Sequence, residues 1–163
     1  MEIVRNYDSP IGTLLLRATE SGLASISFAD GPAAPSALDP ADCSLDRIIS
    51  DTEKWLDVYF SGSVPDFTPQ LAVRTTVFRA EIYDILLRIP YGQTRTYGEI
   101  AADMAAVRGI PRMSARAVGS AVGHNPVPII IPCHRVIGAD GGLTGYSGGL
   151  EKKEFLLRLE KII

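Results

Sequence analysis

Cysteine and histidine are scarce in this sequence, which holds only Cys43, Cys133, His124 and His134 of these two types. Neither cysteine belongs to a cluster with metal-ligand spacing, so we expect no metal site. The two cysteines could form one disulfide, but a two-cysteine chain without an export signal usually keeps both thiols reduced. The sequence therefore favours free thiols, and a free thiol is able to do chemistry.

Long apolar runs are also absent, because no segment approaches the ~18 unbroken apolar residues of a membrane helix. The start of the chain lacks a basic stretch followed by an apolar one, as a secretory signal would have. We therefore expect an intracellular protein, cytoplasmic or, in a eukaryote, nuclear, without a membrane partner. Hydrophobic residues make up 46% and charged residues 21% of the 163 residues, which is typical of a folded soluble chain of one domain or two small ones.

The net charge of -3 hides an asymmetry between the two halves of the chain. Residues 1–72 carry 4 Lys/Arg against 11 Asp/Glu, a balance of -7, and residues 73–163 carry 12 against 8, a balance of +4. The second half could therefore bind phosphates. Uneven surface charge arises by chance as well, and the asymmetry alone does not decide between the two interpretations.

The first half predicts a small α/β domain over residues 1–72. Short apolar runs within residues 2–28 alternate with turn-forming segments at 9–12 and 20–22, which indicates three antiparallel strands. Residues 31–40 are mostly Ala, Pro and Ser and predict a linker. Apolar residues at helical spacing over 45–59 predict a helix after it.

The second half, residues 73–163, predicts a mainly helical domain. An apolar stripe over 78–89 indicates one helix. Residues 96–99 match a capping box, so a helix should run from Tyr97 to about Ala105. Ser114 can cap another helix through Val122. Two short helices around a Gly-containing turn suggest a helix-turn-helix, although any packed helix pair gives a similar pattern.

The most informative segment runs from Asn125 to Val136. Its apolar run between prolines predicts a rigid, buried, extended stretch that delivers Cys133 and His134 at its end. A thiolate is the nucleophile, and a nearby imidazole can accept the thiol proton. The alternative is a small buried cysteine beside a core histidine, which is the commoner outcome for an arbitrary Cys-His pair.

The motif around this pair is much longer than two residues. Arg-Ala-Val-Gly at 116–119, Asn-Pro at 125–126, Pro-Cys-His-Arg-Val at 132–136 and Gly-Tyr-Ser-Gly-Gly-Leu at 145–150 resemble the O6-alkylguanine-DNA alkyltransferases. The resemblance is strong over residues 75–160 and loose before them. It implies an α+β fold with an N-terminal antiparallel sheet and helix, RNase H-like, and a C-terminal winged-helix or helix-turn-helix-like domain that carries the active-site cysteine.

The resemblance also assigns chemistry. Cys133 would accept the alkyl group, His134 would act through a bound water as its base, and Glu154 would orient His134, as in hydrolase triads. Glu154 lies on a helical stripe between Leu150 and Leu157, where we expect a partly buried carboxylate that needs a partner. The alternative is a surface glutamate beside two lysines.

Contacts with DNA are implied in the same way. The small-residue helix that starts near Arg116 would enter the minor groove, with the arginine inserted in place of an everted nucleotide. Tyr97 would rotate the target phosphate and donate a proton to the leaving guanine. The expected DNA-binding residues are Arg116, Ala117, Gly119, Ser120 and Tyr97. The expected pocket for the base comprises Val136, Tyr146, Ser147, Gly148 and Asn125.

The predicted function is therefore repair of O6-alkylguanine in double-stranded DNA by a single, stoichiometric transfer to Cys133, with no cofactor. We expect a monomer; cooperative assembly on DNA and activity on O4-alkylthymine stay open. A non-catalytic alkyltransferase-like lesion binder is the main alternative, although such proteins replace the cysteine. A helix-turn-helix regulator and a cysteine hydrolase are further alternatives. Two features depart from the family pattern: the turn at 107–112 is longer than expected, and His124 has no assigned role.

Overall fold

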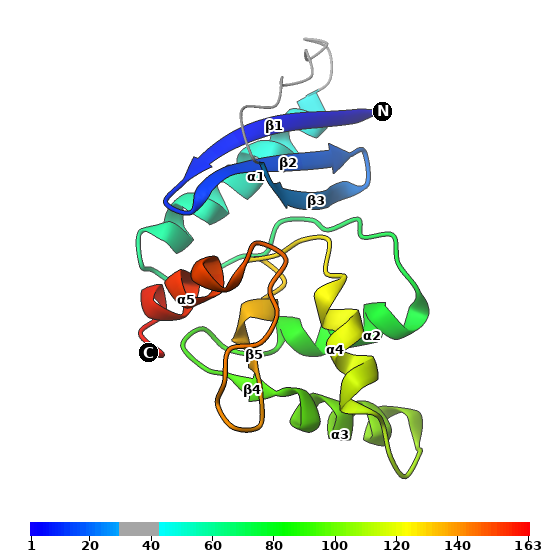
Figure 1. The fold of residues 1–163 in the computed structure, drawn as a ribbon. Coiled ribbons are helices and arrows are strands. Elements are labelled where there is room, and N and C mark those ends of the chain that lie inside the picture. Colours follow the sequence, from blue (N-terminus) through cyan, green and yellow to red (C-terminus); the bar gives the residue numbers. More distant parts are fainter. Residues whose placement is uncertain (30–42) are drawn as a thin grey trace. The chain divides into compact units, whose positions relative to one another are not determined.

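The computed structural model describes residues 1–29 and 43–163, which form two compact units, Met1–Arg74 and Thr75–Ile163. The first unit contains an antiparallel sheet with a helix, and the second is mainly helical (Figure 1). The predicted α+β class is therefore confirmed. Within the described residues, no helix is long and apolar enough to pass through a membrane.

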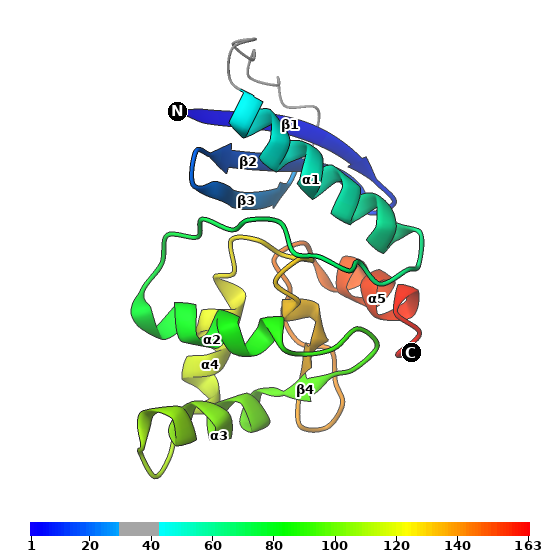
Figure 2. The same cartoon turned by 180° about the vertical axis from the view of Figure 1, so that it is seen from behind.

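The first unit is a three-stranded meander with one helix packed on it. Strands β1 (Glu2–Ser9), β2 (Gly12–Thr19) and β3 (Gly22–Phe28) pair antiparallel in chain order, and α1 (Cys43–Phe60) contacts all three (Figure 2). Alternate residues of β2 face the helix and are fully buried, as the period of a half-buried strand requires. The meander and the helix predicted over 45–59 are confirmed; the predicted linker at 31–40 and the side chain of Cys43 lie outside the described residues.

The second unit starts with α2 (Val77–Leu87), α3 (Tyr97–Arg108) and α4 (Ala115–Gly123). Thr96 and Glu99 form the predicted capping box of α3, with both reciprocal hydrogen bonds present. The helix runs on to Arg108 rather than ending near Ala105, because the left-handed Gly109 supplies its C-cap. Ser114 caps α4 as predicted, accepting from the amide of Ala117 at 3.3 Å.

Helix α4 packs against both α2 and α3. The hydroxyl of Tyr83 on α2 donates to the carbonyl of Ala121 at 3.0 Å, which anchors the buried face of α4. Gly119 faces the ring of Tyr97, where an added Cβ would lie 3.7 Å from the nearest ring atom. His124 is the C-cap residue of α4, and its Nδ1 lies 2.7 Å from the carbonyl of Ser120.

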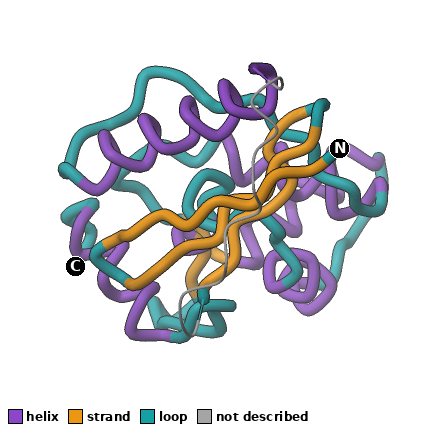
Figure 3. The backbone as a smooth tube through the Cα atoms, turned by 90° about the horizontal axis from the view of Figure 1, so that it is seen from above, coloured by secondary structure: helices purple, strands orange, loops and turns teal. Residues whose placement is uncertain are grey.

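Two short elements connect the helix pair to the cysteine segment. Strand β4 (Arg95–Thr96) pairs in parallel with β5 (Val136–Ile137), which directly follows the 3-10 turn η1 (Cys133–Arg135). The start of α3 and the cysteine turn are therefore fixed to one another by backbone hydrogen bonds. Helix α5 (Leu150–Leu159) then packs on η1. Figure 3 shows the backbone from above, with helices in purple, strands in orange and loops in teal.

Candidate active site

The segment before the cysteine is a buried turn and not the extended stretch that the sequence predicted. The amide of Ile131 donates to the carbonyl of Val127 at 3.0 Å, and Ile129 between them has a φ of 75°. A left-handed conformation is unusual for a β-branched residue and is held only where the surroundings impose it. Proline φ values restrict the chain on both sides, but the apolar pattern alone could not distinguish a buried turn from a buried strand.

Asn125 holds this turn from inside. Its Nδ2 donates to the carbonyl of Ile131 at 2.8 Å, and its Oδ1 accepts from the amide of Val127 at 3.0 Å. Both groups of the amide side chain are therefore used on the backbone that leads to Cys133, and the side chain is only 8% exposed. Asn125 thus fixes where the cysteine lies.

Cys133 opens η1 and is 5% exposed. Burial raises the pKa of its thiol, while the side chain of Asn125 and the ammonium of Lys153 act in the opposite direction. The net effect is a raised pKa, so the sulfur is a neutral thiol at neutral pH. Chemistry at this sulfur therefore needs a base that removes the proton during the reaction.

His134, which follows directly, is fully buried and pairs with a carboxylate. Its partner is Glu160, whose Oε1 lies 2.7 Å from Nε2 of the ring. The prediction that Glu154 orients His134 is wrong. Glu154 instead accepts from Arg158 at 2.6 Å one turn further along α5, and its side chain is 45% exposed, because it lies on the outer face of the helix.

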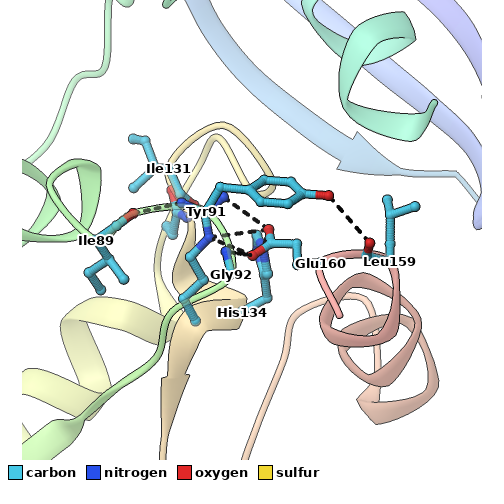
Figure 4. A network of polar contacts seen from close by, with 9 residues as sticks. Ile89, Tyr91, Gly92, Ile131, His134, Leu159 and Glu160 are labelled. Carbon is cyan, nitrogen blue, oxygen red and sulfur yellow. Dashed lines mark hydrogen bonds and ion pairs between the residues drawn. The ribbon is translucent and has the colours of Figure 1, made fainter. Parts of the chain in front are cut away.

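Glu160 is the centre of a buried polar network (Figure 4). Besides His134, it accepts from Nε and Nη2 of Arg135, both at 2.9 Å, and from the amide of Gly92 at 3.1 Å. Burial alone would raise the pKa of this carboxylate, but the hydrogen bonds from His134 and Arg135 outweigh it and hold the pKa at about 2. Glu160 is therefore ionised throughout the physiological range.

The ionised carboxylate determines the tautomer of His134. Because a carboxylate only accepts, Nε2 must carry the ring hydrogen, and Nδ1 carries the lone pair of a neutral imidazole. Burial lowers the pKa of His134, and the charges of Arg135 and Lys153 add to this effect, whereas the hydrogen bond to Glu160 and the charge of Glu160 oppose it. A neutral histidine beside a neutral thiol is the resting state that a proton transfer from sulfur to nitrogen requires.

Lys153 is, like Glu160, a residue of the site to which the sequence analysis gave no role. It is fully buried on α5, and its Nζ donates to the carbonyls of Val136 at 2.7 Å and Thr144 at 2.8 Å. Burial lowers its pKa to about 8. It therefore ties the loop after β5 to the strand and places a positive charge near Cys133.

The helical spacing of residues 153–160 could have indicated that Lys153 and Glu160 are buried, although the sequence analysis missed both. Lys153 and Glu160 are seven residues apart, with the fully buried Leu156 and Leu157 between them, so all four lie on one face. The stripe chosen from the sequence, Leu150, Glu154 and Leu157, shares only Leu157 with this face, and Leu150 is 50% exposed. Two charged residues at the spacing of a buried apolar stripe would have indicated a functional role for Lys153 and Glu160.

The predicted DNA-binding residues lie on the exposed side of the two central helices. Arg116, in the first turn of α4, is exposed, as is Ser120 one turn later, and Ala117 and Gly119 are half-buried. Tyr97 starts α3 and accepts a hydrogen bond at 3.3 Å from Thr144, so its ring lies between α4 and the loop after β5.

The predicted base-pocket residues differ in burial. Val136 is buried and its carbonyl accepts from Lys153, while Asn125 braces the cysteine turn. Ser147 is exposed and Gly148 half-buried, in the loop that leads into α5. Burial raises the pKa of Tyr146 well above its usual value, and Cys133 adds to this effect, so the phenol stays protonated beside the thiol.

No group of three or more His, Cys, Asp or Glu side chains with metal-binding spacing occurs among residues 1–29 and 43–163. The ionisable groups buried around Cys133 include the thiol, the imidazole, the carboxylate and the two cations described above.

Comparisons with known proteins agree with this geometry. Residues 77–162 match the DNA-binding domain of 6-O-methylguanine DNA methyltransferase, and residues 4–73 match its ribonuclease-like domain. The methylated-DNA--protein-cysteine methyltransferase of Methanosarcina acetivorans is 44% identical over 154 residues, which cover 94% of this chain and 95% of the relative. That of Mycobacterium bovis is 44% identical over 161 residues, 96% of this chain and 91% of the relative.

Solved structures give the same result. The O6-methylguanine methyltransferase of Mycobacterium tuberculosis aligns with a TM-score of 0.79 at 44% identity, covering 99% of this chain and 93% of that one. A structure of Mycobacterium tuberculosis OGT in complex with DNA aligns with a TM-score of 0.80 at 43% identity, covering 97% and 92%. Sequence, fold and the arrangement around Cys133 together show that this chain belongs to the 6-O-methylguanine DNA methyltransferase family.

Proposed function

We propose that this protein repairs DNA by transferring an alkyl group from O6 of guanine to Cys133, once per molecule. The single observation that carries the proposal is the placement of Cys133 beside the His134–Glu160 pair within residues 77–162, which match the DNA-binding domain. Cys43, the other cysteine, lies outside that match. The relatives' name specifies a protein cysteine as the acceptor of a methyl group from DNA.

The proton route follows from the tautomer of His134. Its Nδ1 accepts the thiol proton, directly or through one water, and the ionised Glu160 stabilises the positive charge that forms on the ring through its hydrogen bond with Nε2. The ammonium of Lys153 stabilises the thiolate as it forms. Glu160, and not Glu154, is thus the orienting carboxylate of the proposed relay.

The transfer itself exchanges one bond for another. The thiolate sulfur attacks the alkyl carbon, the S–C bond forms, and the C–O6 bond breaks with its electron pair moving to guanine. Guanine takes up one proton, so that the sum is an alkyl group moved from O6 to sulfur and a proton moved from sulfur to guanine. We assign proton donation toward the leaving base to Tyr97. The product is a thioether, which does not regenerate the thiol.

Access to the sulfur requires movement. With 5% of Cys133 exposed, an everted purine reaches the sulfur only when neighbouring groups give way. The loop with Ser147 and Gly148 before α5 is suited to move, since Ser147 is exposed and the loop is rich in glycine. We assign closure over the base to this loop.

For binding, we propose that the exposed side of α4 enters the minor groove of double-stranded DNA. Arg116 and Ser120 are exposed there, and the small residues Ala117 and Gly119 leave the helix backbone close to its surface. Arg116 is the residue proposed to replace the everted nucleotide in the stack. The proposed complex is one monomer per lesion in the compartment that holds the DNA, the cytoplasm or a nucleus.

Intact-mass spectrometry after incubation with duplex containing O6-methylguanine tests the proposal. We expect the protein to gain one CH2, a methyl replacing the thiol hydrogen, located on the Cys133 peptide and limited to one per molecule. Cys133→Ser should abolish the gain and retain DNA binding, whereas Cys43→Ser should leave both unchanged. Repeated turnover would favour a cysteine hydrolase, and lesion binding without any mass gain by the folded protein would favour a non-catalytic binder; either result refutes the transfer.

A further inference from the structure

Arg135 is the buried cation that binds the carboxylate of the proposed relay directly. Its guanidinium is bidentate on Glu160, with Nε 2.9 Å from Oε2 and Nη2 2.9 Å from Oε1, and its remaining nitrogen Nη1 donates to the carbonyl of Ile89 at 2.7 Å. Only 8% of the residue is exposed. A bidentate guanidinium fixes both the position and the charge of its carboxylate partner.

The surroundings hold this pair rigidly. The guanidinium carbon lies 5.7 Å from the centre of the Tyr91 ring, and the hydroxyl of Tyr91 donates to the carbonyl of Leu159 at 3.3 Å (Figure 4). The amide of Gly92 donates to the same carboxylate. Glu160 therefore cannot follow a moving histidine, and the imidazole must take the orientation that the Arg135–Glu160 pair offers.

The protonation state of His134 depends on the Arg135–Glu160 ion pair as well. The charged groups that act on the ring are Arg135 on its own turn, Lys153 on α5 and Glu160 directly after α5. A lone buried carboxylate would favour an imidazolium, which has no lone pair to accept a proton. The positive charge of the Arg135 guanidinium offsets the negative charge of Glu160. The Arg135–Glu160 pair therefore offers His134 a hydrogen-bond acceptor but carries little net charge.

We propose that Arg135 is a positioning residue for alkyl transfer, which neutralises Glu160 so that His134 remains an uncharged base oriented toward Cys133. This inference rests on the proposed function. It assigns to Arg135 a role beyond stability: the guanidinium favours the neutral form of the His134 ring, both by its own charge and by holding Glu160, which accepts from the ring.

The first test measures the single-turnover rate of transfer to O6-methylguanine duplex as a function of pH. In Arg135→Gln the uncompensated carboxylate should raise the pKa of His134, so the acid limb, the decline of the rate in acid, should move up by about one pH unit. Transfer should then be about fivefold slower than in the wild type at the wild-type midpoint, and about tenfold slower well below it. Arg135→Lys retains the charge and should keep the limb near that of the wild type. Arg158→Gln is the matched control, because it removes an arginine that is 63% exposed from the Glu154 pair, and should change nothing.

A double-variant comparison separates this role from a general loss of packing. If Arg135 acts through Glu160, then Arg135→Gln introduced into Glu160→Gln should produce no further shift of the acid limb. Equal shifts in both backgrounds, or a uniform rate decrease at every pH, would overturn the proposal. A wild-type protein that transfers no methyl group refutes the proposed function instead, before any variant is compared.

A measurement on the unaltered protein keeps the inference testable if Arg135→Gln does not fold. Ring-nitrogen NMR of the wild type should show a neutral His134 protonated at Nε2 well below the ordinary histidine pKa of about 6.5. An imidazolium that persists above that pH would contradict the role of Arg135.

Discussion

Replacing Glu160 with glutamine is the substitution whose effect on stability follows most directly from the structure. The change keeps the shape of the side chain and removes a charge that accepts from His134, Arg135 and Gly92. The carboxylate has a pKa of about 2 in place of 4.5, a difference of about 2.5 units, which corresponds to about 3 kcal/mol of stabilisation at neutral pH. Leaving Arg135 buried without a counter-charge costs a similar amount, about 3–5 kcal/mol.

The sign of the pH dependence is determined by the direction of this pKa difference. Because the carboxylate pKa is lower in the folded state, its stabilisation is fully present above about pH 4.5 and is lost as the pH falls from there toward 2. The difference in the free energy of unfolding between wild type and Glu160→Gln should therefore be about 3 kcal/mol near neutrality and shrink through that window.

Urea unfolding followed by far-ultraviolet circular dichroism at several pH values measures this difference. Glu154→Gln serves as the control, since its exposed pair with Arg158 should contribute less than about 1 kcal/mol. Equal losses in the two variants, or a difference for Glu160→Gln that does not change with acid, would refute the account of the buried network. The rate of alkyl transfer should also fall in Glu160→Gln and not in Glu154→Gln.

Two further predictions concern the DNA surface and the buried lysine. Arg116→Gln should weaken binding to duplex DNA about tenfold and reduce the slope of log K against log salt concentration, with transfer from free O6-methylguanine base unchanged, as fluorescence anisotropy and mass spectrometry would show; equal affinity for duplex would contradict the role of α4. Lys153→Met should lower stability by about 1–3 kcal/mol in urea unfolding, because the carbonyls of Val136 and Thr144 lose their donor. It should also remove a decline in transfer rate above about pH 8, where the wild-type ammonium titrates; a decline that persists in the variant would exclude Lys153 as its source.

Interactions between residues close in the sequence were sufficient to predict most of the helices and strands. The capping box at Thr96 and Glu99 and the N-cap at Ser114 set the starts of α3 and α4 where the sequence predicted them, because these hydrogen bonds involve residues only three apart. The identity of the acceptor cysteine was likewise predicted, since the residues around it form a long and specific motif. The functional division of the chain after residue 72 and the roles of individual site residues stay predictions.

Tertiary structure decided how the cysteine segment runs and which acid serves the histidine. The stretch before Cys133 is a turn because Asn125 binds its backbone from both sides, an arrangement that the hydrophobic pattern does not encode. Glu154 and Glu160 are equally plausible partners by residue type and lie less than two turns apart. Packing of α5 on η1 turns one outward and the other toward His134 and Arg135, and only the folded chain fixes that rotation, because it depends on contacts between residues more than twenty positions apart in the sequence.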